Sequence, residues 1–202
     1  MNPIEELIME LAKQKNTSKI ANPYLNDDLA DNLRVYLTHM NKTQGKRVLL
    51  VGEAPGYKGC KITGIPFTSG RVFEKIDHPL LKQIRPKLKI SQLEAENTAS
   101  IVWSYLSTKK SVPLFWNSFP FHPHPKGHVN KNRAPNAEEI KLGRDYLKKL
   151  YALYQPDRVA GIGHKGVECA KKSFPDEKIV YIRHPSYGGK SDFIWGMNNI
   201  IK

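Results

Sequence analysis

Cysteine is scarce in this sequence of 202 residues, which contains only Cys60 and Cys169. Two cysteines cannot supply the four ligands of a structural zinc or iron–sulfur site, and they are too few for a disulfide-stapled secreted scaffold. We therefore expect free thiols in a reducing compartment and no bound metal. The expected location is the cytoplasm, or the nucleoid or nucleus.

Long hydrophobic runs are also missing. No apolar run approaches the roughly 18 residues of a membrane span. Residues 1–16 carry Glu5, Glu6 and Glu10 where a secretory leader would be basic and then apolar. The sequence therefore predicts a protein with no membrane segment.

Acidic residues are few relative to basic ones, with 19 Asp and Glu against 32 Lys and Arg, for a formal net charge of +13. Such an excess favours polyanionic partners through counterion release, nucleic acid first and anionic membrane surfaces second. Charge alone does not decide between these partners, because many basic soluble proteins share it.

The remaining composition is that of a globular chain with a buried core, because 40% of the residues are hydrophobic and 25% are charged. The length predicts one domain over residues 1–202, which we expect to be a monomer. Within it, residues 1–45 are expected to form amino-terminal helices and residues 46–190 a core that carries the motifs.

Apolar residues at helical spacing predict helices over residues 3–14, 26–42, 137–154, 165–174 and 194–201. Asn136 and Glu139 resemble a capping box at the start of the third helix. Between residues 119 and 135, prolines and three histidines predict an irregular loop.

Short and almost wholly apolar runs predict strands that are covered on both faces, as in a parallel sheet. These runs are residues 47–51, 112–117, 158–163 and 178–183. Together with the helices they predict an α/β sandwich.

Chemically useful side chains follow these strands. Glu53 comes after the first strand, Asn117 ends the second, His184 follows the fourth, and Phe67 lies in a glycine-rich segment. Ligands bind at the carboxyl ends of parallel strands, so we expect these groups to meet at one edge of the sheet. An amide, an aromatic ring, an imidazole and a carboxylate suit a planar heterocycle and its attached sugar.

Taken singly, each of these residues has a simpler interpretation. A glutamate in a Gly/Pro-rich turn is more often solvated than catalytic. We expect the loop with His122, His124 and His128 to be solvated and to hold no metal, because no carboxylate or cysteine lies at ligand spacing. Trp116 and Trp195 are expected to pack in the core.

Five segments together resemble the uracil-DNA glycosylase superfamily, and its family 4 branch most closely. They are GEAPG (residues 52–56), GIPFTSG (64–70), the strand that ends in Asn117, residues 132–163, and HPSYGG (184–189). The resemblance implies a three-layer α/β/α sandwich with a central four-stranded parallel sheet. It also implies hydrolysis, without a cofactor, of the N-glycosidic bond of uracil or another deaminated base in DNA.

The resemblance also implies roles for individual residues. Glu53 positions the water, and His184 stabilises the departing base anion. The base would be bound by Ala54, Gly56, Phe67 and Asn117. The residues expected to contact the DNA are Ser69, Lys126, Arg133, Ser186, Tyr187, Gly188, Gly189 and Lys190.

Two departures from family 4, and one feature that is as in family 4, carry further expectations. The four cysteines that bind its iron–sulfur cluster are missing, and Gly143 stands in place of one of them. We therefore expect a relative without the cluster. In it, residues 122–133 should pack where the cluster-binding loop of family 4 would lie. Gly56 replaces a tyrosine of the most uracil-selective branch, which leaves the choice among uracil, hypoxanthine and xanthine open. Tyr187 and two glycines replace a leucine wedge, which predicts a preference for mismatched or single-stranded substrates.

The sequence therefore predicts a monofunctional DNA glycosylase of base excision repair, acting on single- or double-stranded DNA. Two alternatives stay open: an inactive or altered DNA-binding member of the same fold, and a hydrolase of free nucleotides. Activity on oligonucleotides that falls with salt, and none on free deoxyuridine, would favour the DNA enzyme.

Overall fold

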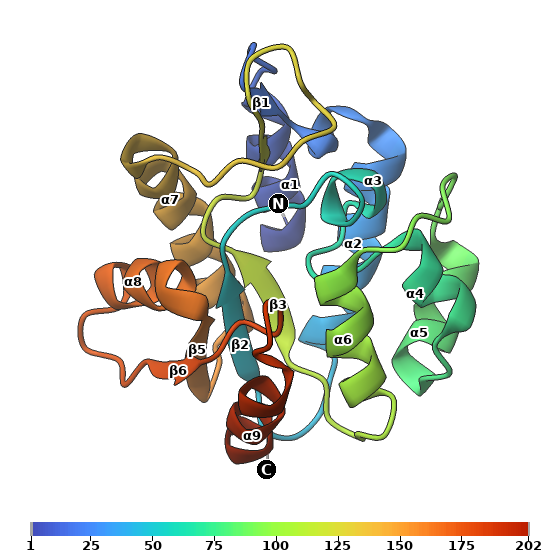
Figure 1. Ribbon diagram of the computed structural model, residues 1–202, viewed down its shortest axis with the longest axis vertical. Coiled ribbons are helices and arrows are strands. Elements are labelled where there is room, and N and C mark those ends of the chain that lie inside the picture. The colour runs from blue at the N-terminus through green and yellow to red at the C-terminus, as the bar shows by residue number, and fades with distance from the viewer. Residues whose placement is uncertain (1, 202) are drawn as a thin grey trace.

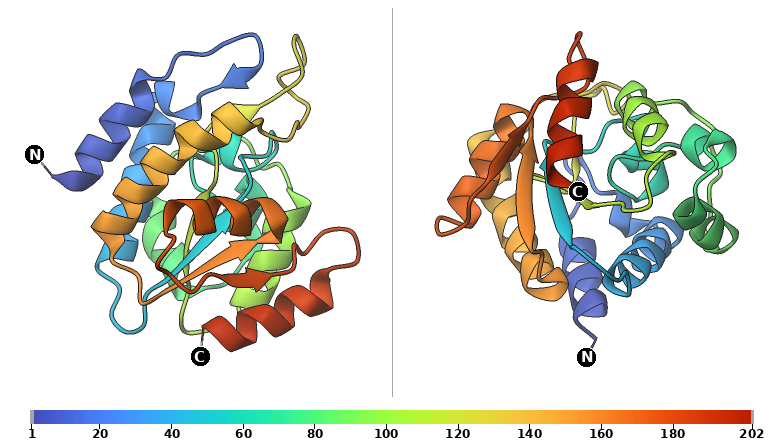
Figure 2. Two further views of the ribbon diagram at one scale, coloured as in Figure 1. Left: turned by 90° about the vertical axis from the view of Figure 1, so that its left-hand side faces the viewer. Right: turned by 90° about the horizontal axis from the view of Figure 1, so that it is seen from below.

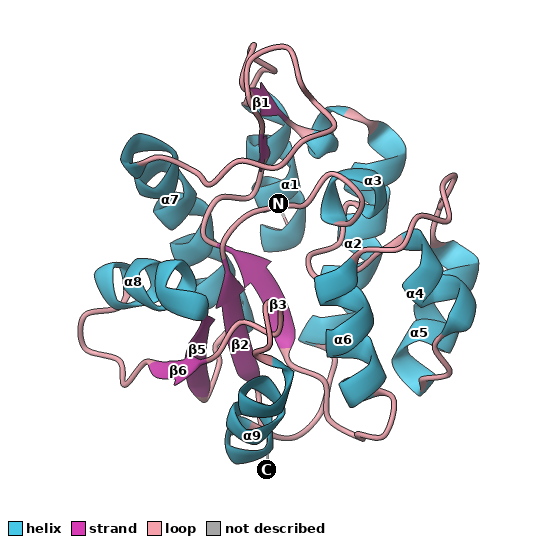
Figure 3. Cartoon of the chain, viewed as in Figure 1, coloured by secondary structure: helices cyan, strands magenta, loops and turns pink. Residues whose placement is uncertain are grey.

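The centre of the fold is a parallel sheet. A computed structural model describes residues 2–201. The sheet order is β3-β2-β5-β6, with β2 (Val48–Gly52), β3 (Leu114–Asn117), β5 (Arg158–Ile162) and β6 (Val180–Ile182) (Figures 1 and 3). Each strand lies within two residues of the predicted one. Strand β2 lies inside the sheet, paired with β3 on one side and β5 on the other, and all five of its residues are buried.

Helices cover both faces of this sheet (Figures 1 and 2). One face carries α7 (Ala137–Tyr154) and α8 (Gly163–Ser173). The other carries α2 (Asp27–Asn41), α6 (Asn97–Leu106) and α9 (Lys190–Ile200). This arrangement confirms the predicted three-layer α/β/α sandwich with a four-stranded parallel sheet.

Shorter elements complete the layers. Helix α1 (Pro3–Lys13) packs against α2 and α7. The segment between β2 and β3 contains four short helices that the sequence patterns did not predict: α3 (Cys60–Thr63), α4 (Gly70–Lys75), α5 (Pro79–Ile84) and η2 (Arg85–Lys87). Another short helix, η1 (Pro23–Leu25), lies before α2. None of the helices within residues 2–201 is long and apolar enough to cross a bilayer.

Helix α7 begins and ends as its sequence predicts. The Asn136 side chain accepts a hydrogen bond from the Glu139 backbone N–H, and the Glu139 carboxylate accepts one from Asn136, which completes the capping box. At the other end, Gln155 takes a left-handed conformation with a φ of 49°, and Pro156 follows. The predicted bounds 137–154 are confirmed.

The loop over residues 119–135 differs from the sequence prediction. It contains β4 (His122–Pro123), which pairs antiparallel with β1 (Ile20–Ala21). His122 and His124 are 0% and 5% exposed, so the expectation of a solvated loop is wrong for both and correct only for His128. The cause is tertiary: the amino-terminal segment supplies a partner strand that no local pattern reveals.

The two tryptophans expected in the core have different environments. Trp116 is fully buried on β3, as predicted, whereas Trp195 is 73% exposed on α9. Helix α9 buries the face that carries Phe193 and Met197, and Trp195 projects from the opposite face. The prediction for Trp195 was wrong because it considered the apolar content of the segment and not its helical phase.

Gly143 lies where α7 passes closest to the end of β3. A Cβ atom at this position would lie 1.8 Å from the carbonyl oxygen of Ser118, which belongs to the backbone and cannot swing away. The glycine is therefore required by this packing, although glycine in a helix interior is otherwise unfavourable.

We predict that Gly143→Ala destabilises the protein by about 1–3 kcal/mol, because overpacking outweighs the gain in helix propensity. Urea unfolding of the variant measures this change. Lys148→Ala, at an exposed position of the same helix, is the matched control and should change stability by less than about 0.5 kcal/mol. A Gly143→Ala protein as stable as the wild type would show that the contact relaxes without cost.

Candidate active-site cleft

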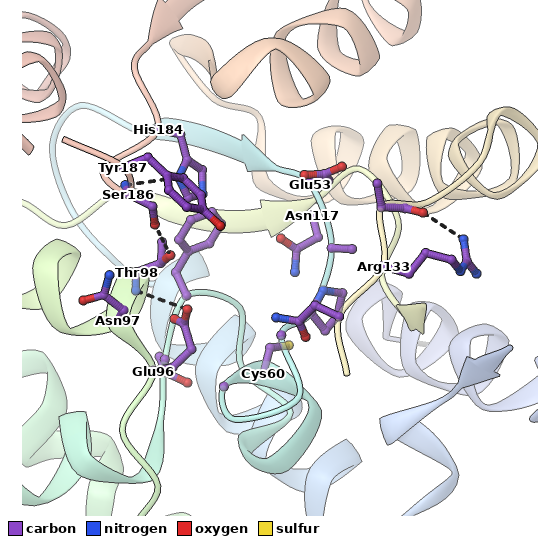
Figure 4. Close-up of a pocket in the computed structure, with 18 residues that line it drawn as sticks. Glu53, Cys60, Glu96, Asn97, Thr98, Asn117, Arg133, His184, Ser186 and Tyr187 are labelled. Carbon is purple, nitrogen blue, oxygen red and sulfur yellow. Dashed lines mark hydrogen bonds between the residues drawn. The ribbon is translucent and has the colours of Figure 1, made fainter. Parts of the chain in front are cut away.

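A cleft of about 520 Å³ opens at the carboxyl edge of the sheet. Figure 4 shows side chains from several loops converging on it, with Glu53 and Asn117 on one side and His184, Ser186 and Tyr187 on another. The structure brings these predicted site residues to the cleft: Glu53, Ala54, Gly56, Phe67, Asn117, Arg133, His184, Ser186 and Tyr187.

The aromatic wall of the cleft depends on Gly52, the last residue of β2. A Cβ atom at Gly52 would lie 2.3 Å from Cζ of Phe67 and 3.0 Å from the side-chain oxygen of Asn117. Only glycine lets the Phe67 ring and the Asn117 amide come this close to the end of the strand.

Phe67 is held from two sides. Its ring packs on Phe115 of β3 with 5.0 Å between centroids, and its carbonyl oxygen accepts a 3.0 Å hydrogen bond from Nε1 of Trp103. The backbone has a φ of 57°, which is uncommon for a residue with a side chain. The surrounding contacts thus hold Phe67 in a conformation that presents its ring to the cleft.

Glu53 and Asn117 are placed side by side by the backbone beyond the strand ends. The carbonyl oxygen of Gly52 accepts hydrogen bonds from the N–H and the hydroxyl of Ser118, and the carbonyl of Glu53 accepts one from Phe119. Asn117 is 3% exposed, and Glu53 is partly buried. Burial raises the pKa of the Glu53 carboxyl, although the nearby Lys165 ammonium acts in the opposite direction.

His184 faces the cleft with a defined tautomer. Its Nδ1 accepts a 3.3 Å hydrogen bond from the backbone N–H of Ser186, so the proton of the neutral ring lies on Nε2. Burial, and then the charge of Arg183, lower the pKa of His184 below its ordinary value. The ring is therefore neutral at neutral pH and can donate one hydrogen bond into the cleft.

Sequence reasoning missed the residues that line the cleft from the start of α6. Glu96 caps this helix by accepting hydrogen bonds from Thr98 and Ala99. The Thr98 hydroxyl lies 3.1 Å from that of Ser186 and so joins α6 to the loop after β6. The other lining residues that were not predicted are Pro55, Gly59, Cys60, Thr68, Asn97, Asn132 and Ala134. The local signal that could have revealed α6 is the helical spacing of Ala99, Val102, Trp103 and Leu106, all of which are buried.

Several residues expected to contact DNA lie outside the cleft. Ser69 is 0% exposed, and its hydroxyl lies beneath the surface with no hydrogen-bond partner, so its side chain is not placed to make the expected contact with DNA. Lys126 and Lys190 are exposed at the surface, Gly188 is exposed, and Gly189 is buried.

Arg133 lines the cleft, but its guanidinium is engaged inside the protein. It donates to both carboxylate oxygens of Glu139 at 2.9 and 2.7 Å. It also donates to the carbonyl oxygens of Lys19, His124 and Ala134. These contacts use all five N–H groups of an arginine. The structure therefore assigns Arg133 to holding its loop, which corrects the expectation of a direct phosphate contact.

The cleft is open beside Gly56. A Cβ atom there would meet only Cγ of Glu96 at 3.8 Å and the amide nitrogen of Asn132 at 3.9 Å, which are ordinary contact distances. A larger side chain at this position would extend into the cleft, and glycine leaves that space available.

The side chains present do not fit an iron–sulfur cluster of the family 4 kind. Cys60 lies beside the Tyr24 hydroxyl and Cys169 beside Ser173, both buried, and the backbone of Ser118 leaves no room for a cysteine at position 143. Within residues 2–201, no group of three or more His, Cys, Asp or Glu side chains is arranged to hold a metal ion.

Comparison with known proteins identifies the family. The family model described as "Uracil DNA glycosylase superfamily" matches residues 39–194, well over half of the chain. The protein therefore belongs to the uracil DNA glycosylase superfamily, whose members are DNA glycosylases. Comparison with curated protein sequences gives no significant match.

A solved structure shares the fold. The chain is similar to the crystal structure of wild-type Pedobacter heparinus SMUG2, with a TM-score of 0.69 and 16% sequence identity. The match covers 98% of this chain and 99% of the other. At this identity the likeness concerns the arrangement of helices and strands.

The ion pair of Arg133 with Glu139 gives a prediction about pH. Burial raises the pKa of Glu139, but the hydrogen bonds from Arg133 and from the Asn136 N–H outweigh it, so the pKa is lowered below 4.5. A carboxyl whose pKa is lower in the folded state stabilises the fold above its unfolded pKa and loses this effect as the pH falls.

We predict that Glu139→Gln lowers the free energy of unfolding at pH 7 by about 1–3 kcal/mol. The difference from the wild type should shrink as the pH falls below 4.5 and through the folded pKa of Glu139. Urea unfolding at a series of pH values measures it. A difference that stays constant down to strongly acidic pH would mean that the ionised carboxylate is not the stabilising form.

Proposed function

We propose that this protein is a monofunctional DNA glycosylase that hydrolyses the N-glycosidic bond of uracil, or of another deaminated base, in DNA. The observation that carries the proposal is the convergence of Glu53, Phe67, Asn117 and His184 on one cleft. Membership of the uracil DNA glycosylase superfamily supports it. The four groups cover the tasks of this reaction: holding the base, stabilising the leaving group and directing water.

The base would enter the cleft as an extruded ring. Phe67 offers an aromatic face for stacking, and the Asn117 amide offers a donor and an acceptor side by side. That pair matches the N3–H and O4 edge of uracil. The space beside Gly56 imposes no barrier to a substituent on the ring, so hypoxanthine and xanthine are also candidate bases.

Bond cleavage would leave negative charge on the departing base. In the proposed mechanism, the Nε2–H of neutral His184 donates to a carbonyl oxygen of the base, and this hydrogen bond strengthens as negative charge develops on the base. The pKa of His184 is lowered, so the ring is neutral and carries one proton. Because Nδ1 accepts a hydrogen bond from the Ser186 N–H, that proton lies on Nε2. The ring then stabilises the base anion by a hydrogen bond, without giving up its proton.

Glu53 would complete hydrolysis. As the C1′–N1 bond breaks, the electron pair leaves with the base and C1′ becomes cationic. The Glu53 carboxylate stabilises this cation and orients the water, whose oxygen bonds to C1′ while its proton passes to the carboxylate. This route needs no lysine nucleophile, which is what makes the enzyme monofunctional.

We predict that Glu53→Gln lowers kcat by at least about 100-fold, the usual scale for a positioned acid–base group. Binding of the oligonucleotide should change little, because the amide keeps the size of the side chain. The assay uses labelled oligonucleotides that each contain one uracil, hypoxanthine or xanthine, with alkaline cleavage of the abasic site as the readout. Glu94→Gln, at an exposed residue paired with Lys58 outside the cleft, is the matched control.

The same assay separates this proposal from its alternatives. Turnover of free deoxyuridine would indicate a nucleotide hydrolase. Salt-dependent DNA binding without abasic sites would indicate a DNA-binding protein of the same fold. Full activity of the Glu53→Gln protein would contradict the role of Glu53 and the mechanism built on it.

The DNA strand would pass over the loop that follows β6. Tyr187 is 98% exposed at the mouth of the cleft, with a φ of 53°, and Gly188 follows with a φ of 78°. Two successive left-handed residues turn the chain sharply and leave the ring clear of the protein. We propose that Tyr187 fills the gap left by the extruded nucleotide, while exposed Lys126 and Lys190 contact phosphates.

Extruding a paired base costs a few kcal/mol, so a mismatched or single-stranded substrate should be cleaved faster than paired A·U. We predict that Tyr187→Ala lowers kcat/KM on paired A·U about tenfold and on single-stranded uracil less than about threefold. Only in the duplex must a base pair be broken, and there the stacking of the Tyr187 ring on the neighbouring bases offsets that cost. Trp195→Ala removes another exposed aromatic ring and serves as the control. Equal losses on both substrates would contradict a wedge.

A further inference from the structure

His122 occupies an unusual position beneath the cleft. Its side chain is 0% exposed, and both ring nitrogens face backbone carbonyl oxygens: Nδ1 lies 2.8 Å from that of Pro55 and Nε2 lies 3.0 Å from that of Val129. Pro55 is two residues beyond Glu53. Val129 belongs to residues 124–134, which we call the basic loop because it carries Lys126, Lys131 and Arg133.

Two exposed hydrogen bonds join the same segments. Asn132 accepts from the Tyr57 N–H at 3.0 Å, and Lys61 donates to Asn130 at 3.3 Å. Hydrogen bonds open to water contribute less to holding a structure than buried ones, whose loss leaves polar groups without partners. The buried His122 ring is therefore the firmest of these connections.

We propose that His122 is a positioning residue that fastens the loop carrying Glu53 to the basic loop, so that the two sides of the cleft keep a fixed relation. The proposal rests on the proposed function, in which Glu53 directs the water and the basic loop contacts DNA. A displacement of about 1 Å in a catalytic group can lower the rate about 100-fold. Anchoring the backbone two residues from Glu53 is therefore significant.

The number of protons on the ring determines how the connection works. Burial lowers the pKa of His122, and the nearby Lys61 and His124 act in the same direction, although the two carbonyl groups oppose the shift. The ring is therefore neutral at neutral pH and has one N–H for two acceptors. The ring donates to Pro55 in one tautomer and to Val129 in the other, so each of the first two substitutions below keeps one of these donors and permanently removes the other.

Three substitutions separate the contacts. In His122→Asn the amide nitrogen falls near the position of Nδ1 and keeps the donor to Pro55. In His122→Gln it falls near Nε2 and keeps the donor to Val129. His122→Phe removes both donors but keeps a ring that can stack on His124, whose ring lies 5.7 Å away at 22°.

We predict that His122→Gln lowers kcat about tenfold or more with little change in KM, because it frees the Glu53 loop. His122→Asn should raise KM about threefold or more with kcat nearly unchanged, because it frees the basic loop. His122→Phe should show both effects. His78→Phe is the control: its ring is also buried and both its nitrogens contact backbone groups, of Leu80 and Lys109, but it does not line the cleft, so its kcat should stay within about twofold of the wild type.

Amide hydrogen exchange provides a readout that does not require activity. His122→Gln should speed exchange at Gly59 and Phe119, whose N–H groups bind Gly56 and Glu53. His122→Asn should speed it at His128 and Lys131, whose N–H groups bind within the basic loop, while the melting temperatures of the two variants stay alike. Parallel losses of kcat, KM and thermal stability in both variants would make His122 merely structural and overturn the proposal. If the wild type cleaves no oligonucleotide, the proposed function fails, and the exchange pattern still decides whether His122 joins the two loops.

Discussion

The close approach of an aromatic ring to the end of a central strand is the constraint on which the cleft depends. Because Gly52 has no side chain, Phe67 can lie against the carboxyl end of β2, beside Asn117 at the end of β3. Parallel pairing places the loops after β2, β3 and β6 at the same edge of the sheet. Glu53 and His184 therefore line the same cleft as the ring, although they come from segments that are far apart in the sequence.

The electrostatics of the cleft follow from its partial burial. The same loss of water raises the pKa of the Glu53 carboxyl and lowers that of the His184 imidazole. Lys165 opposes the effect on Glu53, and Arg183 adds to the effect on His184. The cleft thus places a carboxyl group of raised pKa opposite an imidazole of lowered pKa, the two groups to which the proposed hydrolysis assigns the sugar cation and the base anion.

Sequence patterns predicted the central parts of the fold, because those parts follow from local chemistry. Four apolar runs became the four parallel strands, and the capping box of Asn136 and Glu139 set the start of α7. The residues after the strands could also be assigned to one edge, because that placement follows from parallel topology alone. The cleft confirms that Glu53, Asn117 and His184 lie together.

What the sequence did not reveal depends on contacts between distant segments. His122 is buried because β1 pairs with β4, and Arg133 has no donor left for DNA because Glu139 and three carbonyl groups take all five. Trp195 lies on the exposed face of a helix whose opposite face is buried. Basic and aromatic residues in a sequence thus indicate candidate contacts, but only the packing shows which of them remain accessible.

The most direct test of this account is a crystal structure of the Glu53→Gln protein with a single-stranded oligonucleotide that contains one uracil. We expect the uracil ring stacked on Phe67, its N3 and O4 edge on the Asn117 amide, and its O2 carbonyl oxygen within hydrogen-bond distance of Nε2 of His184. A base bound elsewhere on the protein, with the cleft left empty, would contradict it.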